Sequence, residues 1–413
     1  MKRIFALLLA LSLLLCACGS KPAETTAPTT VPATTEPATV PTTVPTTQAT
    51  VETTTAPTEP ARASMVEGAD QIKNIILIIG DGMGNEHLRS GQLYDGKTYD
   101  FTAWQNVAIN TAPITYAGEI SSDATDSAAS ATAMATGNLT VNKYVGMLPD
   151  GTELTTIMDL AAAMGKATGI VTTDSLLGAT PSGFSAHTRS RSADTVLMNT
   201  QLESGVNLLC GTQDGACMKK ADQIREQGYA YCESYEELES TFSSDKAYWQ
   251  LPLAGVDSEV DLADVAIDAL NYLDQDDDGF VIMIEQAHID KYCHDHEFLG
   301  STQSVSNLNS TVEAVLNWLG DRTDTAVLIT ADHETGGLQV SDQPEYPNAE
   351  VVTVNGETKT LYYIFNAGAH TSTNVTLFVY GVTADFTKSE LYQEETLKNT
   401  GIFYLMADIL NTK

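Results

Sequence analysis

The sequence is poor in basic residues. Its 413 residues include 21 Lys and Arg against 54 Asp and Glu, which gives a formal net charge of −33. A surface this acidic repels nucleic-acid phosphates, so we expect no nucleic-acid partner. It also repels small phosphorylated molecules, unless bound metal ions or a placed Arg supply positive charge locally.

Cysteine is scarce as well, and no two cysteines are spaced as C-x-x-C. A redox motif or a zinc ribbon therefore has little support. Beyond the N-terminal segment four cysteines remain, and export would permit three full pairings among them. A small loop closed by Cys210 and Cys217 is one interpretation, and free buried thiols, including Cys232 and Cys293, are the other.

Long apolar runs are missing except at the N-terminus. Lys2 and Arg3 precede an apolar run at residues 4–15, which is too short to span a bilayer and is typical of a signal peptide. The run ends in "LLLCACGS", which resembles a lipobox with Cys18 as the lipidated residue. We predict a lipoprotein signal peptide at residues 1–18 and an extracytoplasmic, lipid-anchored protein. An ordinary cleaved secretory signal is the alternative.

The segment that follows lacks the apolar residues of a core. Residues 24–61 are almost entirely Thr, Pro, Ala, Val and Glu, and repeated prolines favour an extended backbone. We predict a disordered linker at residues 19–65. Residues 66–413 are enough for one large domain with a substantial core.

Within this domain, apolar runs rich in β-branched residues alternate with helix-like segments. Strands are expected at 74–80, 167–173, 279–285, 325–330 and 374–381. Helices are expected at 155–165, at 258–273 with Ser258 as the cap, at 302–320 and near 396–410. Continuous apolar strands between helices predict an α/β fold, a three-layer α/β/α sandwich with a mostly parallel central sheet.

One acidic segment has two interpretations. Asp274, Asp276, Asp278, Gly279 and Glu285 match the pattern of a calcium-binding loop. Such a loop, however, runs directly into a helix, whereas here the residues after the glycine predict a buried strand. We therefore interpret the acidic cluster as a solvated turn.

Potential metal ligands follow the predicted strands. Asp81 comes after the first strand, and Glu285, Asp290 and His294 come at the end of another. "TADH" supplies Asp332 and His333, and "NAGAHTS" supplies His370 just before the last predicted strand. Functional groups gather where the strands of open α/β sheets finish. Nitrogen and carboxylate ligands together suit zinc, and oxygen ligands alone suit magnesium.

Two further segments could bind an anion. Asp126 and Ser127 open a helix rich in Ala and Ser, where Ser127 suits a helix cap. The same position would stabilise a serine alkoxide or a phosphate, because a helix N-terminus favours negative charge. In the segment 178–191, Thr180 offers a hydroxyl to a hard cation, and Arg191 could clamp two phosphate oxygens.

In this order along the chain, "GDGMG", "TDSAASATA" and "TADH" resemble the alkaline phosphatase family, from about Lys73 to the C-terminus. The resemblance implies that residues 66–413 are an alkaline phosphatase domain. It implies a nucleophilic Ser127, with Asp126 orienting Arg191. It implies two zinc ions and one magnesium ion. The implied ligands are Asp290, His294 and His370 for one zinc ion; Asp81, Asp332, His333 and Ser127 for the other; and Asp81, Thr180 and Glu285 for magnesium.

The implied activity is hydrolysis of phosphate monoesters, with small phosphorylated metabolites as substrates and a phosphoserine intermediate on Ser127. A phosphodiesterase of the same superfamily and a non-catalytic metal-binding surface lipoprotein are the alternatives. Ser127 and Arg191 favour the monoesterase over the diesterase, because diesterases often carry a threonine nucleophile and fewer Arg clamps. They also argue against a metal-binding protein, which needs neither residue. A homodimer is common in the family, but no feature of this sequence predicts an interface.

Two positions depart from the family pattern. Gly178 stands where some bacterial members carry an aspartate that steadies the third metal. Lys291 follows Asp290, as in some bacterial members, and is expected to contact phosphate through water. The remaining histidines match no ligand position: His87, His187, His288 and His296, the last of which is only a poor substitute for His294.

Overall fold

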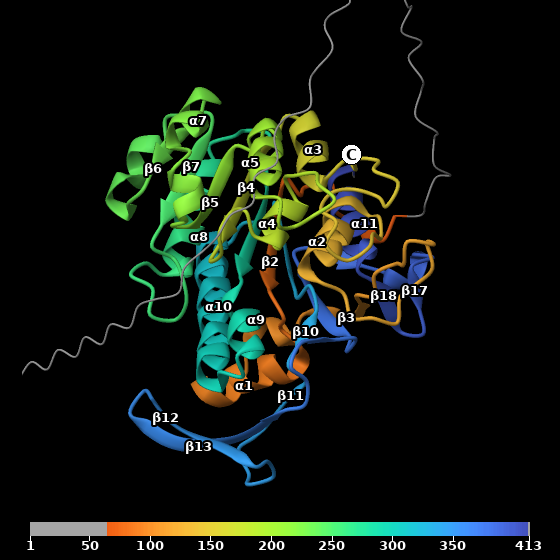
Figure 1. The fold of residues 1–413 in the computed structure, drawn as a ribbon, viewed down its shortest axis with the longest axis vertical. Coiled ribbons are helices and arrows are strands. Elements are labelled where there is room, and N and C mark those ends of the chain that lie inside the picture. The colour runs from red at the N-terminus through yellow and green to blue at the C-terminus, as the bar shows by residue number, and fades with distance from the viewer. Residues whose placement is uncertain (1–63, 412–413) are drawn as a thin grey trace, which may run out of the picture. The chain divides into compact units, whose positions relative to one another are not determined.

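An eleven-stranded sheet runs through the structure, a computed structural model that describes residues 64–411 (Figure 1). The predicted signal peptide with Cys18, and the predicted linker up to residue 63, lie outside the described residues. In spatial order the strands are β17 (Tyr392–Gln393), β18 (Thr396–Lys398), β3 (Gln105–Asn110), β15 (Val375–Tyr380), β9 (Thr325–Thr330), β2 (Asn74–Gly80), β8 (Phe280–Gln286), β4 (Ala167–Thr172), β5 (Leu208–Thr212), β7 (Ala247–Leu251) and β6 (Ala230–Cys232).

The sheet is mostly parallel. From β9 through β2, β8, β4, β5 and β7 to β6, every neighbouring pair is parallel. Strand β15 runs antiparallel to both of its neighbours, β3 and β9. Every residue of β2, β8, β4 and β9 is buried, as expected for strands with helices on both faces.

Two groups of helices cover the sheet (Figure 1). One layer contains α1 (Asn85–Asp95), α8 (Leu262–Leu273) and α10 (Phe298–Leu319), and α9 (His288–His294) packs on α10. The other contains α2 (Ser127–Thr136), α3 (Ile157–Ala163), α4 (Ala179–Gly183) and α11 (Thr400–Asn411). The predicted three-layer α/β/α fold is confirmed. Within residues 64–411, no helix combines the length and apolar character needed to span a membrane.

The remaining elements are short. They are α5 (Asp194–Glu203), α6 (Gly215–Met218), α7 (Ala221–Glu226), the strand pair β1 (Val66–Glu67) and β16 (Thr383–Ala384), the strand pair β10 (Glu334–Thr335) and β14 (His370–Thr371), and 3-10 turns at Asp100–Ala103, Tyr235–Thr241 and Phe386–Lys388. The β10–β14 pair matters for the site, because it holds His370 beside the end of β9.

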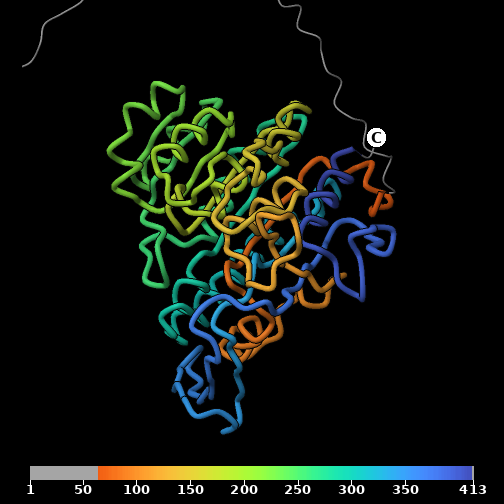
Figure 2. Tube along the Cα trace, turned by 45° about the vertical axis from the view of Figure 1, so that its right-hand side comes forward, coloured from red at the N-terminus to blue at the C-terminus, as the bar shows by residue number. Residues whose placement is uncertain are grey.

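A separate three-stranded sheet was not predicted. Its strands are ordered β11 (Leu338–Ser341), β13 (Glu357–Phe365) and β12 (Asn348–Val354), and Figures 1 and 2 both show it at the opposite end of the domain from β6 and β7. Asn355 and Gly356 join β12 to β13 with φ angles of 54° and 82°. Asn-Gly between two strands is a strong hairpin signal, so the sequence carried this information.

Several predicted boundaries were wrong. Helix α8 begins at Leu262, and Ser258 is no cap, since its hydroxyl donates to the Pro252 carbonyl oxygen at 2.6 Å. Helix α10 begins four residues before the predicted start, at Phe298. The predicted closing helix starts only at Thr400, because the residues before it form β18, and β15 is consequently not the last strand.

The acidic segment before β8 is a turn, as interpreted from the sequence. Asp274 ends α8 and accepts two hydrogen bonds of 2.7 Å from Arg322. Gly279 supplies the bend with a φ of 88°, and β8 begins at Phe280. Glu285 lies buried inside this strand and is therefore separated from the acidic turn.

The four cysteines of the described region are free and buried, so the open question of pairing is answered in favour of thiols. Cys210 lies in β5 and Cys217 in α6. Burial raises the pKa of the Cys217 thiol to about 11, which makes it a poor nucleophile and a poor metal ligand.

Candidate active site

The predicted strand-end residues meet at one edge of the sheet. Asp81 directly follows β2, and Glu285 is the next-to-last residue of β8. Asp332 and His333 are the second and third residues after β9. These three strands are parallel neighbours, with Ile79 of β2 in register with Glu285 and Thr330. Their carboxyl ends therefore present the side chains together.

The first group of potential ligands is Asp290, His294 and His370. The Nε2 atoms of His294 and His370 lie 3.0 Å apart, and they lie 3.4 and 3.5 Å from Asp290 Oδ1. Ligand atoms at zinc bonds of ~2.0–2.1 Å in a tetrahedron are about 3.3 Å apart. Three such atoms at this spacing fit one zinc ion.

Neighbouring groups orient this first set. Nδ1 of His370 donates to the Thr125 carbonyl oxygen at 2.8 Å, which leaves the lone pair of Nε2 facing Asp290 and His294. The Thr335 hydroxyl donates to Asp290 Oδ1 at 2.5 Å. Such contacts fix the tautomer and direction of metal ligands.

The second group is Asp81, Asp332 and His333, and Ser127 adjoins it. Nε2 of His333 lies 3.2 Å from Ser127 Oγ, 3.1 Å from Asp332 Oδ2 and 3.6 Å from Asp81 Oδ1. Asp332 Oδ1 accepts from the backbone N–H groups of Gly82 and His333 at 3.0 and 2.9 Å. Asp332 Oδ2 and Asp81 Oδ1, by contrast, are buried with no hydrogen-bond partner among the described residues.

Unpartnered buried carboxylate oxygens are costly unless a cation binds them. The donor atoms here are one imidazole nitrogen, two carboxylate oxygens and a hydroxyl, the mixture that zinc accepts. The Thr335 hydroxyl accepts from His333 Nδ1 at 3.2 Å while it donates to Asp290, so it connects the two groups. The residues present therefore fit two neighbouring zinc ions.

A third set of oxygen atoms lies beside the second group. Glu285 is buried and accepts a hydrogen bond from Thr172, its register partner on β4. The Thr180 hydroxyl on α4 is buried without a hydrogen-bond partner among the described residues. With Asp81, these residues offer only oxygen ligands, which fits magnesium.

The gathering of carboxylates perturbs their protonation. Burial, followed by the charges of Asp332, Asp290 and Glu285, raises the pKa of Asp81 well above its usual range. Burial and the charge of Asp174 raise the pKa of Glu285 to about 7. Burial lowers the pKa of His333 well below its usual value, so its ring is neutral and able to bind a metal.

Metal ions should stabilise the protein more strongly as the pH rises. In the metal-free protein the pKa of Glu285 is about 7, against an ordinary value of 4.5. Between these values the folded state holds a proton that the unfolded state has lost, so metal-free stability falls as the pH increases. Bound cations keep the carboxylates charged and remove this loss.

The difference in Tm between metal-loaded and chelated protein, measured by calorimetry across this window, is therefore expected to widen toward pH 7. A difference that stays constant from pH 4.5 to 7 would show that the carboxylates are not held protonated in the metal-free site.

Ser127 is the first residue of α2, and the cap is Asp126 rather than Ser127. The Asp126 carboxylate accepts from the Ala129 N–H at 3.0 Å. All of α2 is buried, and its small residues let α4 approach closely, since a Cβ on Gly183 would lie 2.6 Å from Ala131 Cβ. The seryl hydroxyl is therefore held at the positive end of a rigid helix.

Arg191 lies beside this helix start. Its Nη1 donates to Asp126 Oδ2 at 3.2 Å, and its backbone N–H donates to the Lys143 carbonyl oxygen at 2.9 Å. The Lys143 N–H in turn donates to both carboxylate oxygens of Asp126, at 3.1 and 3.0 Å. Asp126 thus receives donors from three directions and orients the half-buried guanidinium.

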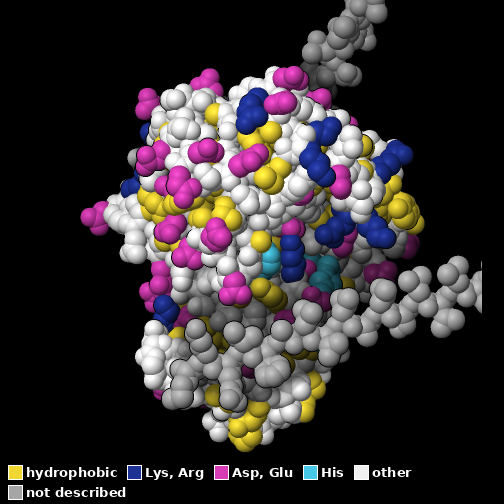
Figure 3. All heavy atoms as spheres, turned by 60° about the vertical axis from the view of Figure 1, so that its left-hand side comes forward, with side chains coloured by type: hydrophobic (Ala, Val, Ile, Leu, Met, Phe, Trp, Pro, Cys, Tyr) yellow, Lys and Arg dark blue, Asp and Glu magenta, His cyan; other side chains and the backbone are white. Residues whose placement is uncertain are grey.

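Lys291 has an acidic partner at the site. Its ammonium pairs with the carboxylate of Asp174, which follows β4 by two residues. Figure 3 shows His side chains beside Lys and Arg side chains in a hollow of one face, while Asp and Glu side chains are scattered over the rest of that face. Local positive charge is therefore present on an acidic protein.

The other histidines make local contacts. His87 lies in the core, where Nε2 is 3.1 Å from Cys293 Sγ, and His187 Nε2 is 2.9 Å from the Leu154 carbonyl oxygen. His288 Nδ1 is 3.1 Å from the Thr173 hydroxyl. His296 stacks on Phe365 and lies 3.0 Å from the Ala367 carbonyl oxygen, so it does not replace His294.

Two residues of the site were missed from the sequence. Thr335 follows "TADHE" with no pattern of its own to mark it as the hydroxyl between the ligand groups. Asp174 had a usable signal, because it stands just beyond a buried strand, as the predicted ligands do.

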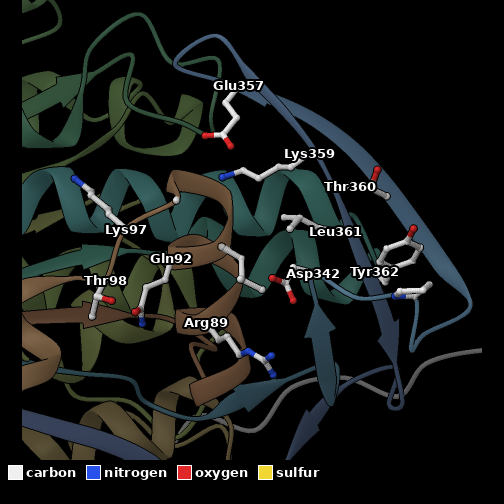
Figure 4. Close-up of a pocket in the computed structure, with 13 residues that line it drawn as sticks. Arg89, Gln92, Lys97, Thr98, Asp342, Glu357, Lys359, Thr360, Leu361 and Tyr362 are labelled. Atoms are coloured by element: carbon white, nitrogen blue, oxygen red, sulfur yellow. The ribbon is translucent and has the colours of Figure 1, made fainter.

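A cavity of about 720 Å³ lies away from the candidate site, between α1 and β13 (Figure 4). Lys359 and Glu357 extend into it from β13, and Arg89 and Lys97 line its other side. Lys97 is paired with Glu313 at 2.6 Å and Arg89 lies 3.6 Å from Glu86. Arg89 and Lys97 therefore already have carboxylate partners, and we assign this cavity no chemistry.

Known proteins are similar to most of the described part of the chain. The pattern that defines the alkaline phosphatase family matches residues 72–212 and 221–401. Alkaline phosphatase 3 of Bacillus subtilis is 29% identical over 307 residues, which cover 69% of this chain and 66% of that protein. Alkaline phosphatase of Escherichia coli is 25% identical over 353 residues, 67% of this chain and 73% of that protein.

Solved structures show the same fold. Alkaline phosphatase of Thermus thermophilus superposes with a TM-score of 0.70 at 19% identity, covering 85% of this chain and 93% of that one. Alkaline phosphatase of the Antarctic bacterium TAB5 gives 0.68 at 23% identity, covering 82% and 98%. With a family pattern that spans most of its length and a matching fold, this chain belongs to the alkaline phosphatase family.

Proposed function

We propose that the protein hydrolyses phosphate monoesters through a phosphoserine on Ser127. The observation that carries this proposal is the position of Ser127. It is the first residue of α2, and its Oγ lies 3.2 Å from His333 Nε2. The Asp126–Arg191 pair lies beside it. A nucleophile, two groups of zinc-type ligands and a fixed guanidinium together suit transfer of a phosphoryl group.

We assign the ligands to three metal ions as the resemblance to the alkaline phosphatase family implies. Asp290, His294 and His370 would hold one zinc ion; Asp81, Asp332, His333 and Ser127 the other; and Asp81, Thr180 and Glu285 the magnesium ion. When bound, the ions would supply positive charge to the phosphoryl oxygens and lower the pKa of the Ser127 hydroxyl.

Ser127 carries the covalent step. Its hydroxyl loses a proton, Oγ forms a bond to phosphorus, and the bond from phosphorus to the ester oxygen breaks. The leaving alkoxide takes up a proton and departs as the alcohol. A water molecule then attacks the phosphoserine, restores the hydroxyl of Ser127 and releases inorganic phosphate.

Arg191 and the start of α2 bind the phosphate. The guanidinium fork can donate two N–H groups to two phosphoryl oxygens, and Asp126 holds it in place. The N-terminal amides of α2 add partial positive charge at the same point. A monoester carries one more ionisable oxygen than a diester, so this arrangement favours monoesters.

Arg191→Ala is expected to lower kcat/KM for 4-nitrophenyl phosphate by ~10²-fold or more, because charge-assisted donors at a developing charge are worth several kcal/mol. The wild-type chain should prefer this monoester over bis(4-nitrophenyl) phosphate. Loss of Arg191 should narrow that preference. Steady-state rates on both esters provide the measurement.

Arg189→Ala is the matched control, since Arg189 instead donates to the Asp150 carbonyl oxygen at 3.1 Å and should leave both rates unchanged. A wild-type preference for the diester would make the phosphodiesterase the better assignment. Failure to hydrolyse either ester would favour the non-catalytic metal-binding protein. The small phosphorylated substrate, the lipid anchor at Cys18 and the homodimer stay predictions.

A further inference from the structure

Gly178 leaves a space that another residue occupies. A Cβ atom at position 178 would lie 2.8 Å from Asp174 Oδ2 and 2.9 Å from the Ser175 carbonyl oxygen, closer than real Cβ atoms approach. Gly178 caps α4, which carries the Thr180 hydroxyl, a buried group without a hydrogen-bond partner among the described residues. The Asp174 carboxylate therefore fills the volume in which a side chain at 178 would begin, two residues before Thr180.

Asp174 is fixed in this place by several contacts. Its backbone N–H donates to the Thr172 hydroxyl at 2.9 Å, and that hydroxyl donates to Glu285. Its Oδ1 accepts from the Ser175 N–H at 2.7 Å and from the Lys291 ammonium. Oδ1 is thus engaged, while Oδ2 is the oxygen on the side of Gly178.

Asp174 lies beside the third set of ligands, because its backbone N–H donates to the Thr172 hydroxyl, which in turn donates to Glu285. Asp81, Thr180 and Glu285 give a magnesium ion only three protein residues. Magnesium takes about six oxygen ligands and usually keeps several waters, so a nearby carboxylate has waters to accept hydrogen bonds from.

We propose that Asp174 is an outer carboxylate of the magnesium site, which orients the ion's waters from the position left open by Gly178 and holds Lys291 at the rim. This inference rests on the proposed function, since it deepens the assignment of the third metal. Asp174 is a positioning residue and not a direct ligand. A plain surface ion pair with Lys291 is the competing explanation and would add little to stability.

Magnesium affinity distinguishes the two explanations. We would titrate Mg²⁺ into the zinc-loaded full chain by calorimetry. Asp174→Asn keeps the shape but removes the charge, and it should weaken Mg²⁺ binding by ~10–100-fold, the usual effect of losing an outer-shell partner. Lys291→Ala removes a nearby cation and should not weaken Mg²⁺ binding.

An Mg²⁺ affinity of Asp174→Asn within about twofold of wild type would overturn the proposal, as would an equal loss in Lys291→Ala.

The calorimetric result is independent of hydrolysis. A wild-type chain that binds Mg²⁺ but hydrolyses no phosphate ester would refute the proposed function while the Asp174 comparison still applies. A wild-type chain that hydrolyses the monoester with zinc alone and binds no Mg²⁺ would refute this inference and leave the proposed function standing.

Discussion

Replacing Ser127 with alanine is expected to lower kcat on a phosphate monoester by a factor on the order of 10⁴–10⁶, the usual effect of removing a catalytic nucleophile. The Ser127 hydroxyl forms the covalent bond to phosphorus. Ser127 is the first residue of α2, and its Oγ lies 3.2 Å from His333 Nε2. The fold should be unaffected, because alanine suits a buried helix that is already rich in alanine.

Ser192→Ala provides the control, as Ser192 is an exposed serine beside Arg191 and should retain full activity. Acid quenching with a ³²P-labelled monoester should trap label on the Ser127 peptide of the wild type and none in Ser127→Ala. A variant that keeps more than about a tenth of the wild-type rate would exclude Ser127 as the nucleophile, since a loss that small is ~1.4 kcal/mol of barrier.

Removing the metals should abolish activity and also lower stability. After exhaustive dialysis against a chelator, we expect loss of essentially all activity and a Tm lower by several degrees. A metal ion that binds only the folded state stabilises it by ~2.7 kcal/mol when its free concentration is about a hundred times its Kd. This stabilisation is lost when the metal is removed. Zn²⁺ together with Mg²⁺ should restore both properties.

The physical reason lies in the charges of the site. Asp81 and Asp332 each keep one buried oxygen without a partner among the described residues, and burial raises the pKa of both carboxyls. His370→Ala should lose one zinc ion per chain by elemental analysis, whereas His296→Ala, at a histidine outside the ligand groups, should lose none. Full activity in a chain stripped of metal would refute this account.

Much of the site could be predicted because the sheet is parallel. Buried apolar strands can be recognised from composition, and the carboxyl ends of parallel neighbours share one edge. Asp81, Glu285 and Asp332 each lie at or just beyond such an end, so the sequence order of the segments was enough to group them. The family resemblance then divided them among ions.

The remaining features depend on contacts between distant segments. The hydrogen bond from His370 to Thr125 joins residues that are 245 positions apart, and no local pattern indicates it. The hydroxyl of Thr335 is placed by the turn after β9. Asp174 reaches the space at Gly178 because the chain curls back between β4 and α4, which depends on backbone geometry that residue type alone does not specify.

The central claim is that cations bind side by side around Ser127. Anomalous diffraction at the zinc edge, from crystals of the zinc-loaded chain, tests it most directly. We predict two peaks ~3.5–4 Å apart, the usual separation in two-metal sites. One peak should lie among Asp290, His294 and His370, and the other should lie within bonding distance of Asp81, Asp332 and His333, next to Ser127 Oγ. Zinc bound only elsewhere, with both ligand groups empty, would contradict the claim.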